Sequence, residues 1–253
     1  MVLTSKNNPL IKETASLKEK KGRRETGLFL VEGVKMCKEC ASSGLQIDKI
    51  FIEENCALPA ELSAHAEKTV FVSEAVMRYL SDEKTPQGVL CRVKIPQNGL
   101  QSPSGACLLL DGVSDPSNVG AVIRTANACG YNEVYLTKEC ADPYAPKCVR
   151  ASMSGVFFTK IYIAEREEIL ARLHDIPLIV ADMAGENAFT FDAPKTFVLV
   201  IGNEGNGVSE RVRECAQYTV KIPMRETQES LNASVSAGIL MYLLKREEFS
   251  LQI

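Results

Sequence analysis

Residues 106–129 read ACLLLDGVSDPSNVGAVIRTANAC, and this stretch decides the fold class. Its first five residues, Ala106 to Leu110, form an apolar run typical of a central strand in a parallel sheet, which is buried on both faces. A turn-rich segment follows, and residues from about Asn118 to Cys129 are predicted to form a helix. Ligand sites of open α/β sheets gather at the carboxyl ends of such strands, so this loop is a candidate site.

The same alternation of strand and helix patterns continues along the whole chain. In the C-terminal part we predict strands at 134–136, 158–162, 178–181, 196–201 and near 220–224, and a last helix at 230–245. In the N-terminal part we predict strands at 28–31, 49–52, 69–72 and 89–93, and helices at 9–21, from 34 to about 42, and at 73–80, with Gly22 ending the first helix. Alternating strands and helices predict an α/β protein.

A linker composition separates these two parts. Residues 96–105 read PQNGLQSPSG, which is rich in proline, glycine and serine. We therefore predict a small α/β domain at 1–96, a linker at 97–105 and a larger domain at 106–253.

Composition excludes several classes of protein. The chain has 253 residues, 45% of them hydrophobic and 24% charged, which is ordinary for a globular protein. No apolar run approaches the roughly 20 residues that span a bilayer, and the first residues lack the apolar core of a secretion signal, so a cytoplasmic protein without membrane association is expected.

Cysteines and histidines give no clear pattern of metal ligands. Nine cysteines are present, and Cys37 and Cys40 form a CxxC without a second pair at zinc-site spacing. Reduced cysteines are the favoured interpretation, and a metal or redox pair is the alternative. The two histidines, His65 and His174, lie in unremarkable surroundings, so acid–base chemistry is expected from other groups.

Positive charge gathers near the N-terminus although the net charge is −3. The run consists of Lys6, Lys12, Lys18, Lys20, Lys21, Arg23 and Arg24. Such a run attracts phosphates, and it is also the composition of a solvated helix face, so RNA contact and simple solvation both stay open.

Polar residues in the strand–loop–helix unit need explanation. Asn118 is a candidate cap for the helix. Arg124 lies in an otherwise apolar helix, where a guanidinium needs a carboxylate or phosphate partner. Structural pairing and a functional role are equally compatible with this segment taken alone.

Two later segments have the same strand-then-loop form. VLVIGNEGNGVS at 198–209 has three glycines within six residues, which lets main-chain groups approach a ligand, and a carboxylate, Glu204, that a tight turn does not require. It is neither the dinucleotide fingerprint nor a P-loop. VKIPM at 220–224 is followed by SLNASVSAG at 230–238, where Ser230 is a candidate helix cap and Asn232, a poor helix former, is expected one turn inside the helix.

Taken in order, these three segments resemble the motifs of the SpoU-type (TrmH-like) RNA ribose 2′-O-methyltransferases. The matching features are the Asn-xx-Gly-Ala-xx-Arg-Thr-Ala, Gly-x-Glu-Gly-x-Gly and Ile-Pro-Met…Ser-Leu-Asn-x-Ser patterns. The N-terminal part more loosely resembles the family's substrate-binding domain, which is similar to a ribosomal RNA-binding protein, through FLVEG at 29–33 and TPQG at 85–88. The one departure is Asn203, where the family often has Ser or Ala.

This resemblance implies a fold, a cofactor and an activity. It implies a C-terminal parallel-sheet domain tied in a trefoil knot, a homodimer whose sites borrow from both subunits, and methyl transfer from S-adenosylmethionine to a ribose 2′-hydroxyl of structured RNA. Ribosomal RNA is favoured over transfer RNA. A non-catalytic RNA-binding protein, a base methyltransferase and a Rossmann oxidoreductase are the alternatives.

The resemblance also implies roles for individual residues. The catalytic set is Arg124, Asn118, Glu204 and Asn232, and whether Arg124 takes the proton or only positions the substrate stays open. The cofactor set is Leu199, Ile201, Gly202, Ile222, Met224 and Leu231. The RNA-binding set is Arg124, Ser230, Lys20, Arg23 and Arg24.

Overall fold

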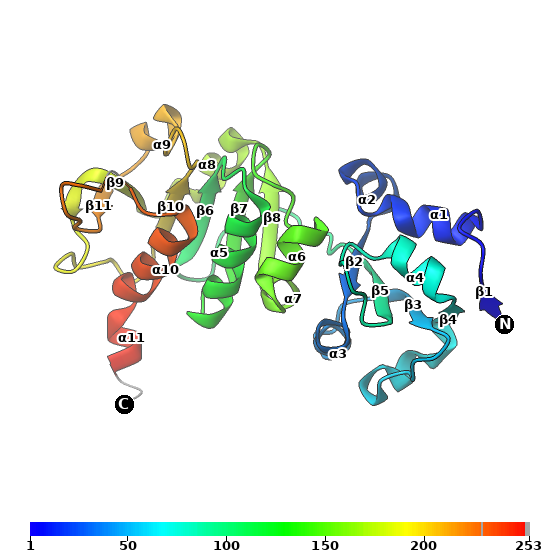
Figure 1. Cartoon of the computed structure of the whole chain (residues 1–253). Helices are drawn as coiled ribbons and strands as arrows, with labels where there is room; N and C mark the ends of the chain where they lie inside the picture. Colours follow the sequence, from blue (N-terminus) through cyan, green and yellow to red (C-terminus); the bar gives the residue numbers. More distant parts are fainter. Residues whose placement is uncertain (229, 251–253) are drawn as a thin grey trace. The chain divides into compact units, whose positions relative to one another are not determined.

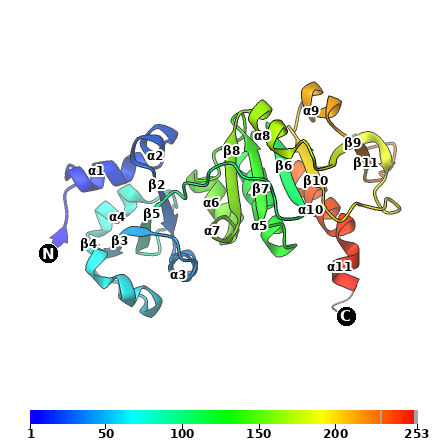
Figure 2. The same cartoon turned by 180° about the vertical axis from the view of Figure 1, so that it is seen from behind.

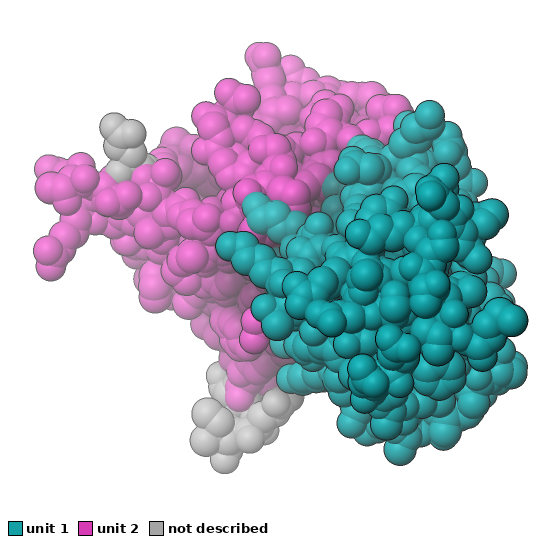
Figure 3. Space-filling model, turned by 45° about the vertical axis from the view of Figure 1, so that its right-hand side comes forward, with its two compact units in different colours: residues 1–97, 142–157 teal, residues 98–141, 158–253 magenta. Residues whose placement is uncertain are grey.

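Two compact units make up the chain in the computed structural model, which describes residues 1–228 and 230–250. Unit 1 comprises residues 1–97 and 142–157, and unit 2 comprises residues 98–141 and the chain from 158 onward (Figure 3). The division differs from the predicted one, because the segment 142–157 was assigned to the C-terminal domain and instead packs with the N-terminal unit.

Unit 1 is built on a mixed sheet of five strands. Their order is β1 (Val2–Leu3), β4 (Thr69–Val72), β3 (Ile47–Glu53), β5 (Val89–Lys94) and β2 (Leu28–Glu32). β3 is parallel to β4, whereas β5 is antiparallel to both of its neighbours. The four strands predicted from apolar runs in this part of the chain are confirmed.

Helices of unit 1 differ from the prediction near the N-terminus. They are α1 (Pro9–Ser16), α2 (Lys20–Thr26), α3 (Val34–Ser42), the 3₁₀ segment η1 (Ala60–Lys68) and α4 (Glu74–Leu80). The single helix predicted at 9–21 is therefore wrong, because the chain leaves α1 before α2 begins. Gly22 does not end a helix but lies within α2, where a Cβ would come 2.2 Å from the Ser16 carbonyl oxygen. A glycine is needed there because α2 returns closely onto the end of α1.

The segment 142–157 completes unit 1 with α6 (Pro146–Ser152) and α7 (Gly155–Phe158), whose last residue belongs to unit 2. The ring of Tyr144 packs against that of Phe29, with 5.1 Å between centroids. Arg150 forms ion pairs with Asp82 (2.7 Å) and Glu83 (2.8 Å). These contacts join residues far apart in sequence, and no local pattern in the segment could have revealed them.

Unit 2 contains a six-stranded, all-parallel sheet. Its order is β11 (Tyr218–Lys221), β9 (Leu178–Asn187), β10 (Val198–Gly202), β6 (Cys107–Asp111), β7 (Glu133–Thr137) and β8 (Lys160–Ala164). β6 and β10 are the central pair and are almost entirely buried, as their unbroken apolar runs predicted.

Helices cover both faces of this sheet (Figures 1 and 2). On one face, Leu109 and Val200 pack in a common core with Ile169 of α8 (Arg166–Leu173) and Val212 of α9 (Glu210–Glu214). The other face carries α5 (Pro116–Ala128) and α10 (Ala233–Leu244), which lie side by side, and α10 is followed by α11 (Arg246–Ser250). Among the described residues, no helix is both long enough and apolar enough to cross a membrane.

The stretch predicted as a linker is not free of the domain that follows it. Asn98 donates to the carbonyl of Ile161 (3.3 Å), and the hydroxyl of Tyr135 donates to the carbonyl of Gln101 (2.7 Å). From Asn98 onward, this stretch therefore belongs to unit 2.

All nine cysteines are free thiols. Burial raises the pKa of Cys40 to about 12, and burial together with the neighbouring Cys91 raises the pKa of Cys37 well above its usual value. Both thiols of the CxxC are therefore protonated at neutral pH and unreactive. Within the described part of the chain, no three acidic, cysteine or histidine side chains are grouped so as to hold a metal ion.

Candidate active site

The carboxyl ends of β6 and β10 place two loops side by side. The strands are parallel neighbours, with Asp111 in register with Gly202. The loop from Gly112 to Asp115 and the glycine-rich loop, defined here as residues 203–208, therefore leave the sheet at the same edge. This is the edge at which open α/β sheets bind ligands.

The cap of α5 is Asp115, not Asn118 as predicted. The Asp115 carboxylate accepts hydrogen bonds from the backbone N–H of Ser117 (2.6 Å) and of Asn118 (3.2 Å), and Pro116 occupies the first helical position. Asn118 is only 9% exposed. Because Asp115 caps the helix, the side chain of Asn118 is available for contacts with other elements.

At the start of α10 the cap is Asn232, not Ser230. The Asn232 side-chain oxygen accepts from the backbone N–H of Ser234 (2.9 Å) and Val235 (3.2 Å). Its Nδ2 donates to Oδ1 of Asn118 (3.0 Å). One amide therefore begins a helix and also binds a second helix, which explains why asparagine stands at this position.

Glu204 completes a relay of three polar side chains. Nδ2 of Asn118 donates to Oε1 of Glu204 (2.8 Å), so hydrogen bonds run from Asn232 through Asn118 to Glu204. We call these three residues the polar relay. Each comes from a different motif of the sequence, and the structure brings together the predicted catalytic residues Asn118, Glu204 and Asn232.

The Glu204 carboxylate is also bound by the loop before α5. Oε2 accepts from the backbone N–H (3.2 Å) and the hydroxyl (3.1 Å) of Ser114, and Oε1 accepts from the backbone N–H of Asp115 (3.3 Å). Partial burial raises the pKa of Glu204, but the hydrogen bonds from Asn118 and the backbone outweigh it, and the pKa is lowered overall. A carboxylate has about four acceptor positions, and here all are used. Glu204 is thus an ionised group that joins two loops.

Asn203, the one departure noted from the family pattern, shapes the glycine-rich loop. Its Oδ1 accepts from the backbone N–H of Gly205 (2.9 Å) and Asn206 (3.1 Å), and its Nδ2 donates to the carbonyl of Gly112 (2.8 Å). Gly202 precedes this turn, and a Cβ there would lie 2.2 Å from the carbonyl carbon of Gly207. The loop can therefore close only with a glycine at 202.

A cavity of about 770 Å³ opens beside this loop. It is lined by Ala181, Asp182, Met183, Ile201, Gly202, Asn203, Glu204, Gly205, Gly207, Val220, Lys221, Ile222, Met224, Ser230, Leu231, Asn232, Ala233, Ser236 and Leu240. The size is that of a small-molecule site, and apolar side chains beside accessible backbone suit an adenine ring. The residues present therefore fit S-adenosylmethionine.

The cavity contains most of the predicted cofactor and substrate residues of unit 2. Ile201, Gly202, Ile222, Met224 and Leu231 all line it, and so does Ser230. Leu199 does not, because its side chain lies wholly buried within β10. That position therefore packs the sheet beneath the site.

Arg124 lies apart from the polar relay and from the residues that line the cavity of its own chain. Its side chain is exposed on α5, it is not among the residues that line the cavity, and it makes no hydrogen bond or ion pair with the described residues. Of the two alternatives left open for Arg124, a buried structural pair is not found, because the side chain is exposed and a solvated guanidinium needs no partner. Its five donors are instead available to a ligand.

The predicted basic residues of unit 1 divide into two kinds. Lys20 and Arg24 are exposed. Arg23 is 3% exposed, donates to the Asp142 carboxylate (2.7 Å) and donates to the carbonyls of Leu17 (2.8 Å) and Lys18 (2.9 Å). The structure thus gives Arg23 a structural role in place of the predicted RNA contact.

Two acidic residues at this edge of the sheet were missed. Asp111 is buried at the end of β6, and Asp182 lines the cavity while pairing with Arg213. The position of Asp111 directly after an apolar strand was the available signal. No sequence pattern indicated Asp182, because it lies in an irregular part of β9. There the pairing with β11 shifts from Thr219 opposite Val180 to Val220 opposite Glu186.

Comparison with known proteins identifies the family. The model of the SpoU rRNA Methylase family matches residues 105–242, more than half of the chain, and that of the MRM3-like substrate binding domain matches residues 8–91. The chain is 28% identical over 246 residues to the 23S rRNA (guanosine(2553)-2′-O)-methyltransferase RlmP of Bacillus subtilis, covering 96% of this chain and 98% of that protein. It is 30% identical to the 23S rRNA (adenosine(1067)-2′-O)-methyltransferase of Streptomyces laurentii, covering 98% and 97%.

Solved structures agree with this assignment. The AdoMet-bound rRNA methyltransferase from Sinorhizobium meliloti has a TM-score of 0.88 at 27% identity and covers 98% of each chain. The SpoU methyltransferase AviRb from Streptomyces viridochromogenes, in complex with AdoMet, has a TM-score of 0.87 at 26% identity, covering 96% of this chain and 99% of that one. The chain therefore belongs to the SpoU rRNA methylase family and is an S-adenosylmethionine-dependent methyltransferase.

Proposed function

We propose that this protein methylates a ribose 2′-hydroxyl of ribosomal RNA. The observation that carries the proposal is the polar relay of Asn232, Asn118 and Glu204, two of whose members line the cavity that fits the cofactor. The relatives named as 23S rRNA 2′-O-methyltransferases support both the ribose and the ribosomal RNA. When bound, S-adenosylmethionine supplies an electrophilic methyl group.

In this proposal the cavity walls hold the cofactor and the rim holds RNA. Ile201, Ile222, Met224 and Leu231 surround the adenosine, and Gly202 allows the loop beside it to close. Ser230, exposed at the cavity, contacts the RNA. The task of these residues is alignment, because a positioned hydroxyl and an electrophilic methyl group react readily.

Removal of the hydroxyl proton is not assigned to Glu204, whose acceptor positions are already filled by Asn118, Ser114 and Asp115. The guanidinium of Arg124 carries five N–H donors and no acceptor, so we assign it to binding the reacting nucleotide through a phosphate or the hydroxyl itself.

Unit 1 is proposed to bind the RNA beyond the reacting nucleotide. The match of residues 8–91 to a substrate-binding family supports this role, and Lys20 and Arg24 are exposed cations on α2 that suit phosphate contacts.

For unit 2 we propose the trefoil knot that the family resemblance implies. The match of residues 105–242 to the SpoU rRNA Methylase family and the similarity to a solved SpoU methyltransferase support this proposal.

We further propose a homodimer in which Arg124 of one protomer serves the cavity of the other. An apolar strip on α10 supports this, since Val235 and Tyr242 are about half exposed (50% and 47%) and Ile239 lies between them. The exposed, free Arg124 is on the neighbouring helix α5.

Mixed dimers test this arrangement. We expect a random mixture of Arg124→Ala chains and Asn118→Asp chains to regain about a quarter of wild-type activity, because half of the dimers are mixed and each keeps one intact site. Near pH 8, each variant alone is expected to keep no more than about a hundredth of wild-type activity. A mixture that stays as inactive as its components would contradict the shared site.

The proposed reaction is tested by mapping ribose methylation in ribosomal and transfer RNA from cells with and without the gene. We expect one 2′-O-methyl group of ribosomal RNA to disappear in the deletion strain and to return when the purified protein and cofactor are added. Loss from transfer RNA, or loss of a base methyl group, would contradict the proposal.

A further inference from the structure

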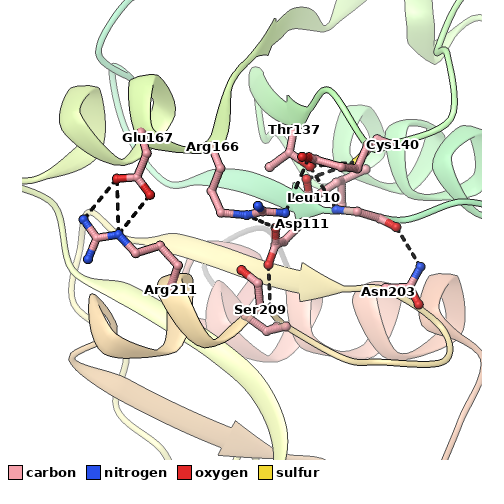
Figure 4. Close-up of polar contacts among 12 residues, drawn as sticks. Leu110, Asp111, Thr137, Cys140, Arg166, Glu167, Asn203, Ser209 and Arg211 are labelled. Atoms are coloured by element: carbon pink, nitrogen blue, oxygen red, sulfur yellow. Dashed lines mark hydrogen bonds and ion pairs between the residues drawn. The ribbon is translucent and has the colours of Figure 1, made fainter.

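Asp111 is buried at the end of β6 beneath the glycine-rich loop. Its side chain is 1% exposed and its two oxygens have different partners (Figure 4). Oδ1 accepts from Nε of Arg166 (2.8 Å), and Oδ2 accepts from the backbone N–H of Ser209 (2.7 Å). A buried carboxylate is stable only when paired and hydrogen-bonded, and Asp111 meets both conditions.

These contacts hold the exit of the glycine-rich loop. Ser209 directly follows residues 203–208, while Asn203, at the entry, donates to the carbonyl of Gly112 (2.8 Å; Figure 4). Two consecutive residues, Asp111 and Gly112, therefore bind the two ends of one loop. Arg166, the partner of this carboxylate, is itself held in place. Its backbone begins α8, and its Nη2 lies 3.5 Å from Oε2 of Glu139.

We propose that Asp111 is a positioning residue for the cofactor, acting through the glycine-rich loop. Asp111 does not line the cavity, whereas Asn203, Glu204, Gly205 and Gly207 do. The strands beneath the loop are held by their own backbone pairing between residues 107–111 and 198–202. Loss of the Asp111 contact therefore frees the loop before it disturbs the sheet. The inference rests on the proposed use of this cavity for S-adenosylmethionine.

The test is Asp111→Asn, which keeps the size of the side chain and removes its charge. We expect the Kd for S-adenosylmethionine, measured by calorimetry, to rise about tenfold, as for a weakened hydrogen bond to a charged group. We expect the fold-decrease in kcat at saturating cofactor to be smaller than the fold-increase in Kd. Amide hydrogen exchange of the ligand-free protein should quicken at 203–209 and stay unchanged at 198–201.

A matched control is Glu167→Gln, which also replaces a carboxylate with an amide. Glu167 directly follows Arg166 in the chain. Glu167 pairs with Arg211 (3.0 Å), but both side chains are exposed and neither contacts the loop (Figure 4). We expect its Kd to stay within about twofold of wild type, since exposed ion pairs contribute little. Arg166→Lys, which keeps the charge and loses the planar fork, should give an intermediate Kd.

Each outcome has a definite meaning. A wild-type Kd with unchanged exchange at 203–209 in Asp111→Asn would overturn the proposal. Faster exchange throughout unit 2 would also overturn it, because Asp111 would then support the fold as a whole. Failure of the proposed RNA function is distinguishable, since wild-type protein would then bind the cofactor without methylating RNA while the exchange comparison still holds.

Discussion

Replacing Arg124 with alanine is expected to reduce methyl transfer to RNA by about 10²- to 10³-fold, the usual cost of losing one positioned polar group at a reacting centre. The side chain is exposed and lies outside the cavity, so the cofactor keeps all of its contacts. Calorimetry should therefore give an unchanged Kd for S-adenosylmethionine, and the loss should appear in single-turnover methylation.

Arg124→Lys is the companion variant, because it keeps the charge but lacks the fork that binds a phosphate in two places. We expect it to recover only part of the activity, and thermal melting should show both variants as stable as wild type, since an exposed side chain without a partner contributes little to folding. Near-normal turnover in Arg124→Ala would remove this residue from the site.

Much of the sheet could be predicted because central parallel strands are apolar on both faces. The runs Ala106 to Leu110 and 196–201 became β6 and β10, the two central strands. Helix boundaries were less predictable, because they depend on which polar side chain reaches a free backbone N–H. Asp115 and Asn232 cap their helices, whereas Asn118 and Ser230 had been expected to do so.

Three of the four predicted catalytic residues come together in the structure, but the hydrogen bonds that connect them could not be predicted. Asn118, Glu204 and Asn232 were recognisable as polar residues in three strand-end loops, and the structure joins them in one relay. Glu204 is 86 residues and Asn232 is 114 residues from Asn118 along the chain, so no local pattern in the sequence indicates these hydrogen bonds. Arg23 illustrates the opposite error, since its partner Asp142 is 119 residues away and a basic run alone cannot reveal a buried ion pair.

Asn118→Asp is expected to have the second large effect, because it removes the donor of one hydrogen bond in the relay without changing the size of the side chain. The oxygen that accepts from Asn232 is kept, but the Nδ2 that donates to Glu204 at 2.8 Å becomes a second carboxylate oxygen. The resulting repulsion separates the two loops and should lower turnover about 10²-fold near pH 8, as expected for a misplaced reacting group. The exposed Asn127→Asp on the same helix is the matched control and should keep wild-type activity.

The pH dependence of Asn118→Asp distinguishes this explanation from general damage. Two adjacent carboxylates raise the pKa of the pair, so lowering the pH adds one proton that again donates to Glu204. Activity of the variant should therefore rise as the pH falls from about 8 to about 6, while wild type shows no such gain, because its Glu204 has a lowered pKa and stays ionised over this range. A loss of activity that is the same at every pH would mean that the donor at position 118 is not what the site requires. Partial recovery on acidification would show that the site requires a hydrogen-bond donor between residue 118 and Glu204.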